Sequence, residues 1–172
     1  MGAKYKLEKR EIIDISFWTW IPNVSVGPFR FGTPITNYLK RYSLCDGDEY
    51  NTLTYPDLKL KSLQSEGFEK MNQYIIPTYD SAFTVYTTSG VIDEFRLETY
   101  LFYNCQDIIM TSIEEAMEII GRSDYDDERT EEVIDEIQRV FYFYDLGLSL
   151  WTQDGVVVTA FCDDGTRWNP NR

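Results

Sequence analysis

The stretch "YDSAFTVYTTSGVIDE" (Tyr79–Glu94) has the same pattern as "YDLGLSLWTQDGVVVT" (Tyr144–Thr159). The offset between the two is 144 − 79 = 65 residues, and it holds along the whole stretch. The identical positions are Tyr79, Asp80, Thr87, Gly90 and Val91 in the first copy and Tyr144, Asp145, Thr152, Gly155 and Val156 in the second. The sequence therefore predicts one structural unit that is used twice.

Each copy has the pattern of a β-hairpin. A run of alternating β-branched and aromatic residues is interrupted by Ser89-Gly90 in the first copy and by Asp154-Gly155 in the second. Small dipeptides of this kind tolerate the positive φ angles of a two-residue turn. Valine or isoleucine follows each turn, so we expect the chain to pair back on itself as a second strand.

A helix is predicted upstream of each hairpin. Apolar residues recur with helical spacing at Ile35, Tyr38, Leu39 and Tyr42, and again at Ile113, Ala116, Met117 and Ile120. Thr33 and Thr111 are candidate N-caps, and Gly121 is a candidate stop for the second helix. The segments just before these helices are expected to be extended.

The remaining segments give weaker patterns. We expect a strand in 11–24, a short helix around 66–74 and a frayed C-terminal tail. The acidic segment 124–136 is expected to form a charged helix, because Val133, Ile134 and Ile137 make a narrow apolar stripe on it.

These elements predict an α+β fold. Two units, each a helix plus an antiparallel hairpin, share one antiparallel sheet with helices on one face. The whole chain, 1–172, is predicted to be a single domain with an internal duplication, in which the first repeat covers approximately 26–98 and the second 99–163. One half has too few strands to cover its own apolar face, whereas two halves share a core.

The composition excludes several classes of function. The 172 residues contain no histidine, which removes Ser-His-Asp and Cys-His centres and disfavours an enzyme. The formal net charge is −13, so nucleic acid and anionic membranes are not expected partners. No run of apolar residues is long enough to cross a membrane, and the charged N-terminus is unlike a secretion signal. We therefore expect a cytoplasmic protein.

No metal or cofactor is expected. The three cysteines are far apart and form no C-x-x-C pair. The segment "DGDEYN" after Cys45 begins like a calcium loop, but Asn51 stands where that loop needs glycine and Asp57 where it needs glutamate. Phosphate-binding glycine motifs are missing from the sequence.

Two sets of residues are candidates for binding a partner. The first is the acidic segment, with Asp124, Asp126, Asp127, Glu128, Glu131, Glu132, Asp135 and Glu136 against Arg129 alone. Its field would steer a cationic partner, although the same pattern describes an ordinary solvated helix. The second set is Tyr86 and Trp151, which are out of phase with Phe83 and Leu150 and would lie on the outer face of the sheet. That face could instead be covered by helices.

The layout from "FRFGTPI" through the "YD" strand and the glycine hairpin, followed by a second such unit, resembles the small acidic immunity proteins of bacterial polymorphic toxins, including contact-dependent growth inhibition systems. It is also similar to the tandem-repeat β-lactamase inhibitor proteins. The resemblance implies a cytoplasmic antitoxin that occludes a cognate basic toxin domain, such as a nuclease, by stoichiometric binding. The alternatives are a small-ligand-binding or enzymatic domain and an interaction adaptor without a toxin.

Overall fold

An eight-stranded antiparallel sheet organises the protein. The structure, a computed structural model, describes residues 14–47 and 71–166. In spatial order the strands are β10 (Asp127–Val133), β11 (Glu136–Phe143), β12 (Leu148–Gln153), β13 (Val156–Asp163), β7 (Val91–Leu97), β6 (Asp80–Thr88), β5 (Met71–Ile76) and β4 (Cys45–Asp46). Consecutive strands of the chain are neighbours within β4–β7 and within β10–β13, and the two groups meet where β7 pairs with β13.

The two predicted hairpins are confirmed. β6 pairs with β7 and β12 pairs with β13, each across the expected two-residue turn. Ser89 and Asp154 both have φ near 52°, and each is followed by a glycine in the left-handed region. Each hairpin also has a register shift at the same place, between Tyr86 and Thr87 in one and between Trp151 and Thr152 in the other.

The junction of the two groups is nearly symmetric. Arg96 pairs with Phe161, and these two positions are themselves equivalent at the offset of 161 − 96 = 65 residues. An approximate two-fold axis therefore passes through this pair. On either side of it, Phe95 pairs with Cys162 and Leu97 pairs with Ala160.

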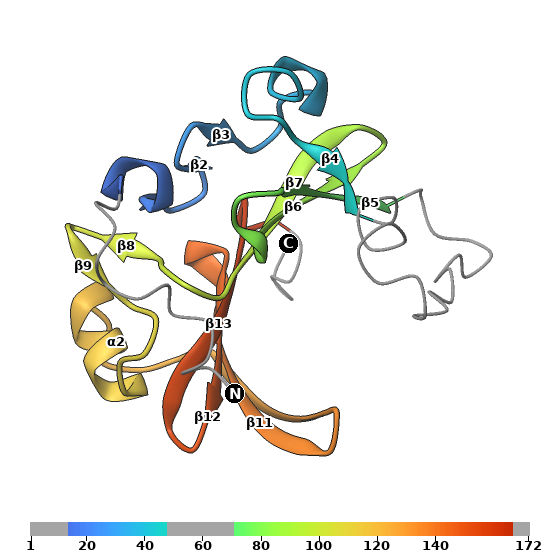
Figure 1. Cartoon of the computed structure of the whole chain (residues 1–172). Coiled ribbons are helices and arrows are strands. Elements are labelled where there is room, and N and C mark those ends of the chain that lie inside the picture. Colours follow the sequence, from blue (N-terminus) through green and yellow to red (C-terminus); the bar gives the residue numbers. More distant parts are fainter. Residues whose placement is uncertain (1–13, 48–70, 167–172) are drawn as a thin grey trace.

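Smaller elements cover one face of the sheet. They are the strands β1 (Trp20–Ile21), β2 (Ser25–Val26), β3 (Phe29–Arg30), β8 (Phe102–Tyr103) and β9 (Gln106–Asp107), the α-helix α2 (Ile113–Ile120), and the 3-10 helices η2 (Ile15–Trp18), η3 (Ile35–Asn37) and η4 (Tyr144–Leu146). Figure 1 shows α2 beside the β8–β9 hairpin, with β2 and β3 further along. The β2–β3 and β8–β9 ladders confirm that the segments before the two predicted helices are extended.

The same backbone hydrogen bonds tie this layer to each hairpin. Ile92 N donates to Thr33 O at 3.0 Å, and Val157 N donates to Thr111 O at 2.9 Å. Both donors lie two residues after the glycine of the hairpin turn. The fold thus repeats an arrangement as well as a sequence pattern, while the boundaries of the two repeats and the single-domain division stay predictions.

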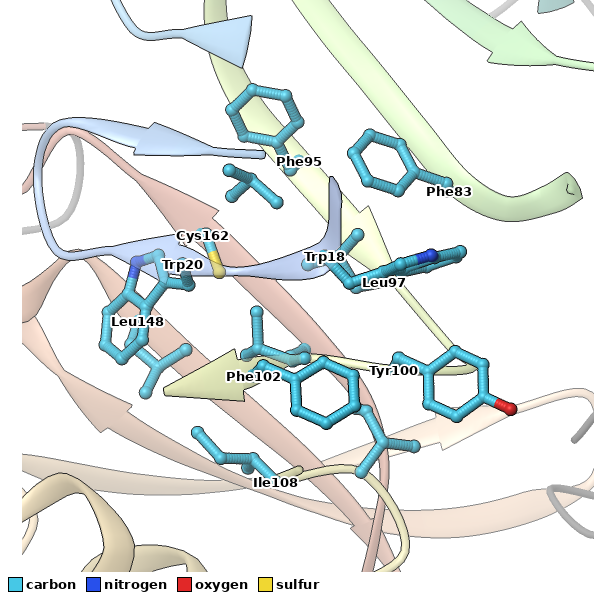
Figure 2. Packing of buried hydrophobic residues seen from close by; sticks show 14 of the residues in the cluster. Trp18, Trp20, Phe83, Phe95, Leu97, Tyr100, Phe102, Ile108, Leu148 and Cys162 are labelled. Atoms are coloured by element: carbon cyan, nitrogen blue, oxygen red, sulfur yellow. The ribbon is translucent and has the colours of Figure 1, made fainter. Parts of the chain in front are cut away.

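Aromatic side chains fill the space between the layers. Trp18 and Trp20 are buried, and Trp18 makes edge contacts with Phe83 at 5.0 Å and with Tyr100 at 5.6 Å between ring centroids. Figure 2 shows the two tryptophans between Phe83 and Phe95 on one side and Tyr100 and Phe102 on the other. The 3-10 turn of η2 breaks the strand that we expected here, and both indoles reach the core as a result.

The first predicted helix is wrong. Only the 3-10 helix η3 forms there, and its N-cap Pro34 offers no side-chain hydrogen bond. Thr36 and Asn37 have low helix propensity, so a costly first turn is not propagated. The apolar stripe is nevertheless used, because Tyr38 and Tyr42 both pack on Phe29.

The predicted acidic helix is also wrong. Residues 127–133 form the strand β10, which pairs with β11 along its whole length. Ile134 and Asp135 form the turn between them, with φ of 46° and 63°. The helix expected around 66–74 falls partly outside the described residues, and from Met71 the chain is the strand β5. The apolar segment 58–63 and most of the calcium-like loop lie outside the described residues.

The predicted fold class therefore needs correction. The described protein is mainly β, and α2 is the only complete α-helix in residues 14–47 and 71–166. That helix is confirmed with one change, since Ser112 rather than Thr111 caps it by accepting from Glu115 N. Gly121 ends it in the left-handed conformation, as predicted. No helix in the described part of the chain is long and apolar enough to cross a bilayer.

Two glycines with similar backbone angles allow a test of the junction between β12 and β13. Gly147 has φ of +61°, and a Cβ there would collide with the carbonyl oxygen of Asp163, whereas Gly155 has φ of +78° and open space around it. We expect Gly155→Ala to cost about 1–2 kcal/mol of unfolding free energy from its left-handed backbone alone. Gly147→Ala should cost about 1–3 kcal/mol more because of the overlap. Urea denaturation of both variants measures the difference, and equal costs would contradict the close approach.

Candidate partner-binding surface

The acidic segment lies at an edge of the sheet. β10 is the last strand beyond β11, and Figure 1 shows this hairpin extending away from α2 and the small strands. Because antiparallel pairing holds β10 in an extended form, its side chains alternate between two faces. The charge is therefore spread over both faces of a hairpin instead of one face of a helix.

Two of the acids are held by tyrosines and arginines. Asp127 accepts from the Tyr144 hydroxyl at 3.0 Å and from Arg129 Nε at 3.1 Å. Glu128 accepts from the Tyr125 hydroxyl at 2.8 Å and from Arg139 Nε at 2.6 Å. These contacts connect β10 to β11 and to the loop before it, so both acids have structural roles.

The same contacts lower the pKa values of these groups. The Tyr144 hydroxyl first, and Arg129 second, hold the pKa of Asp127 below its ordinary value. For Glu128 the Tyr125 hydroxyl is the larger cause and Arg139 the second, and its pKa is again lowered. A carboxyl with a lower pKa in the folded state stabilises the fold at neutral pH, and this contribution is lost as the pH falls through the folded pKa.

A third acid is also engaged. Asp126 accepts from Tyr144 N at 2.7 Å and lies 3.7 Å from Arg122. Of the eight acids, three are thus paired with arginines, which leaves 8 − 3 = 5 without an ion pair to any described residue. These five are Asp124, Glu131, Glu132, Asp135 and Glu136, and the last four surround the hairpin turn.

Tyr86 and Trp151 directly follow the core residues Val85 and Leu150 along β6 and β12, so their side chains point to the other face of the sheet. Neither belongs to the hydrophobic core that holds Phe83 and Leu150. Both are half-buried rather than exposed, and burial raises the pKa of Tyr86. The Trp151 ring contacts Phe161 at 5.6 Å, and its Nε1 is buried with no hydrogen-bond partner among the described residues.

The two candidate sets are separate places on the sheet. Trp151 lies on β12, two strands from β10, and Tyr86 lies on β6, five strands from β10. With neighbouring strands about 4.8 Å apart, these steps correspond to roughly 10 Å and 24 Å. One protein partner of ordinary size could reach both, but the structure does not bring them together as one cluster.

Two hollows among the described residues are rival candidates for a small-ligand site. A cavity of about 10 Å³ beside η4 has room for little more than one water molecule. An open hollow of about 610 Å³ lies between β9 and α2, lined by Gln106, Asp107, Glu115, Glu118 and Ile119. Asp107 there accepts from the backbone of Leu101 and Ile109, so it helps to hold the chain. No group of residues suited to hold a metal occurs in the described part of the chain.

Sequence reasoning missed two functional candidates, Ile134 and Ile137. Their side chains are 89% and 71% exposed, the largest values among the bulky apolar residues of the described chain. Their spacing predicts a narrow apolar stripe on a charged helix instead. The dipeptide Ile134-Asp135 gave no turn signal, because a β-branched residue is a rare choice for a left-handed turn position.

Comparison with protein families and known structures gives no relative for this chain. No family model matches it, and neither the curated proteins nor the solved structures contain a match. The resemblance to immunity proteins therefore remains a prediction from the sequence layout.

The tyrosine contacts can be tested separately. Tyr125→Phe should raise the pKa of Glu128 toward its ordinary value and leave that of Asp127 unchanged, because only the first loses a hydrogen bond. Tyr144→Phe should raise the pKa of Asp127 and leave that of Glu128 unchanged. Carbon-detected NMR titration of the two carboxyls measures both pKa values in each variant, which makes each variant the control for the other. A common shift of both groups in either variant would contradict the paired network.

Proposed function

We propose that this protein is a non-catalytic, stoichiometric inhibitor of a basic protein, of the kind represented by cytoplasmic immunity proteins of bacterial toxins. Binding of its acidic hairpin occludes the active or substrate-binding site of the toxin domain. The observation that carries the proposal is the turn region of β10–β11. Four acids there have no ion pair to a described residue and flank two exposed isoleucines.

The charge distribution favours a cationic partner. A net charge of −13 repels phosphate backbones and anionic lipids, so direct binding to nucleic acid or a membrane surface is disfavoured. A toxin that binds nucleic acid presents a basic site, and an acidic protein surface complements such a site. Attraction between the two accelerates their encounter and is weakened by salt.

The contacts of the acids decide which of them can be substituted in a binding test without disturbing the hairpin. Asp126 and Asp127 bind Tyr144 and nearby arginines, so a variant there would disturb the hairpin itself. Glu131, Glu132 and Asp135 make no such contact in the described chain. They can be changed with little effect on folding, since exposed charges contribute little to stability.

A ligand-binding or enzymatic function has less support. The hollow beside α2 is open and acidic, and it lacks the enclosed apolar lining typical of small-molecule sites. An adaptor that binds a basic protein without inhibiting it would use the same hairpin. An inhibitor lowers the activity of its partner and an adaptor does not, so a measurement of that activity distinguishes the two.

The test is a pull-down at low and high salt with the wild-type chain as bait. It is carried out on extracts of the native cells and on the product of the adjacent open reading frame. The variant Glu131→Gln/Glu132→Gln/Asp135→Asn should associate with the retained basic protein about tenfold more slowly at low salt, with a flatter salt dependence. The control Glu114→Gln/Glu115→Gln/Glu118→Gln removes the same charge from α2 and should leave the association rate near that of wild type. Association rates come from surface-based kinetics, and the partner's activity is titrated in parallel.

Three results would reject the proposal. Retention of no protein at either salt concentration removes the inhibitor function. Equal slowing in both triple variants shows that net charge, and not the hairpin, drives association. A partner that stays fully active when saturated identifies an adaptor.

A further inference from the structure

The turn of the β10–β11 hairpin exposes an apolar side chain in an unfavourable backbone conformation. Ile134 has φ of 46°, a region in which a branched Cβ crowds the backbone. Asparagine or glycine is the usual residue at such a position. At 89% exposure, the side chain gains little from burial within this chain. The residue is thus poorly suited to the turn and to the solvent that surrounds it.

A second isoleucine enlarges this apolar tip. Ile137 is 71% exposed and pairs across the hairpin with Glu132. Val133 and Glu136 are also paired, directly before and after the turn. The tip therefore presents aliphatic side chains within a ring of carboxylates, a combination unlike a solvated turn.

The edge position indicates what can cover the tip. β10 has seven residues and no strand beyond it in the described structure, whereas the opposite edge strand β4 has only two. Pairing of β10 with β10 of a second copy would bring like charges together across the new ladder, which is unfavourable. The complementary occupant is a cationic protein surface with an apolar floor.

We propose that the hairpin tip is the anchor of the complex, with Ile134 and Ile137 inserted into an apolar cleft that lysine and arginine side chains border on a basic protein domain. This inference rests on the proposed function, since its occupant is the protein inhibited there. The carboxylates around the tip govern how fast the complex forms. The two isoleucines govern how long it lasts, because desolvated apolar anchors carry most of the energy in an interface.

The sharpest variant is Ile134→Asn. Asparagine tolerates the left-handed conformation, so the thermal midpoint should rise by roughly 2–4 °C instead of falling. The same change removes the anchor, and dissociation from the retained partner should become at least about tenfold faster. The control is Ile21→Asn, which changes another isoleucine, 51% exposed, on β1, a strand outside the eight-stranded sheet. That variant should dissociate like wild type.

A photo-crosslinking residue, p-benzoylphenylalanine, provides a second readout in the native cell. Placed at Ile137 it should crosslink to the basic protein, and the attached peptide should contain apolar residues next to lysine or arginine. Placed at Ile21 it should give no such product. Mass spectrometry identifies the attachment site.

Each outcome has a defined meaning. If a partner is retained but Ile134→Asn and Ile137→Asn both dissociate at the wild-type rate, the anchor is rejected and the inhibitor proposal stands. Equal acceleration by Ile21→Asn also rejects the anchor. A lower thermal midpoint for Ile134→Asn contradicts the strained turn, and Ile137→Asn, on a regular strand, then decides the docking site. Retention of no protein rejects both proposals.

Discussion

The pairing of β7 with β13 is the contact on which the architecture depends. Each strand is the last member of its own four-stranded group, and each would present a free edge if the groups were apart. Their ladder also places Phe95 beside Cys162 and Leu97 beside Ala160, all fully buried. The apolar rows of the two groups thereby become continuous beneath α2 and the small strands. One four-stranded group alone could neither cover its apolar surface nor pair the backbone N–H and C=O groups of its edge strand.

The β7–β13 pairing also determines which strands form the two edges of the sheet. Once β7 and β13 are joined, the outermost strands of the sheet in the described part of the chain are β4 and β10. β4 is too short to template a further strand. β10 is longer, and its acidic side chains oppose pairing with another copy of itself. The charge that would attract a basic partner thus also protects the protein against edge-to-edge aggregation, so the two roles cannot be separated by composition alone.

Local patterns in the sequence predicted the hairpins and α2, because turn dipeptides, alternation and helix ends act over a few residues. They failed where distant pairing decides the structure. The acidic segment has helix-forming glutamates, yet β11 offers it a complete ladder, and tertiary pairing overrides propensity. The sequence also indicates that these acids concentrate charge, but their division into paired and unpaired groups depends in part on Arg139 and Tyr144, which only the fold brings near. Ile134 and Ile137 could not be found from the sequence, because a pattern that predicts burial gives no sign of exposure.

The two halves show how one arrangement accommodates different local chemistry. Ile35 and Ile113 are both tied by their N–H groups to the turn glycine of the adjacent hairpin. After Ile113 the chain has two glutamates in a capped first turn, and the helix continues to Gly121. After Ile35 it has threonine and asparagine, and the helix stops within one turn. The hydrogen bond to the hairpin glycine is therefore common to both halves, whereas only the second half continues into an α-helix. In the β10–β11 hairpin the core residues Phe141 and Phe143 lie at the far end of β11, whereas the exposed Ile134 and Ile137 lie at and next to the turn. The turn end of the hairpin contributes nothing to the core, so a partner is free to shape it.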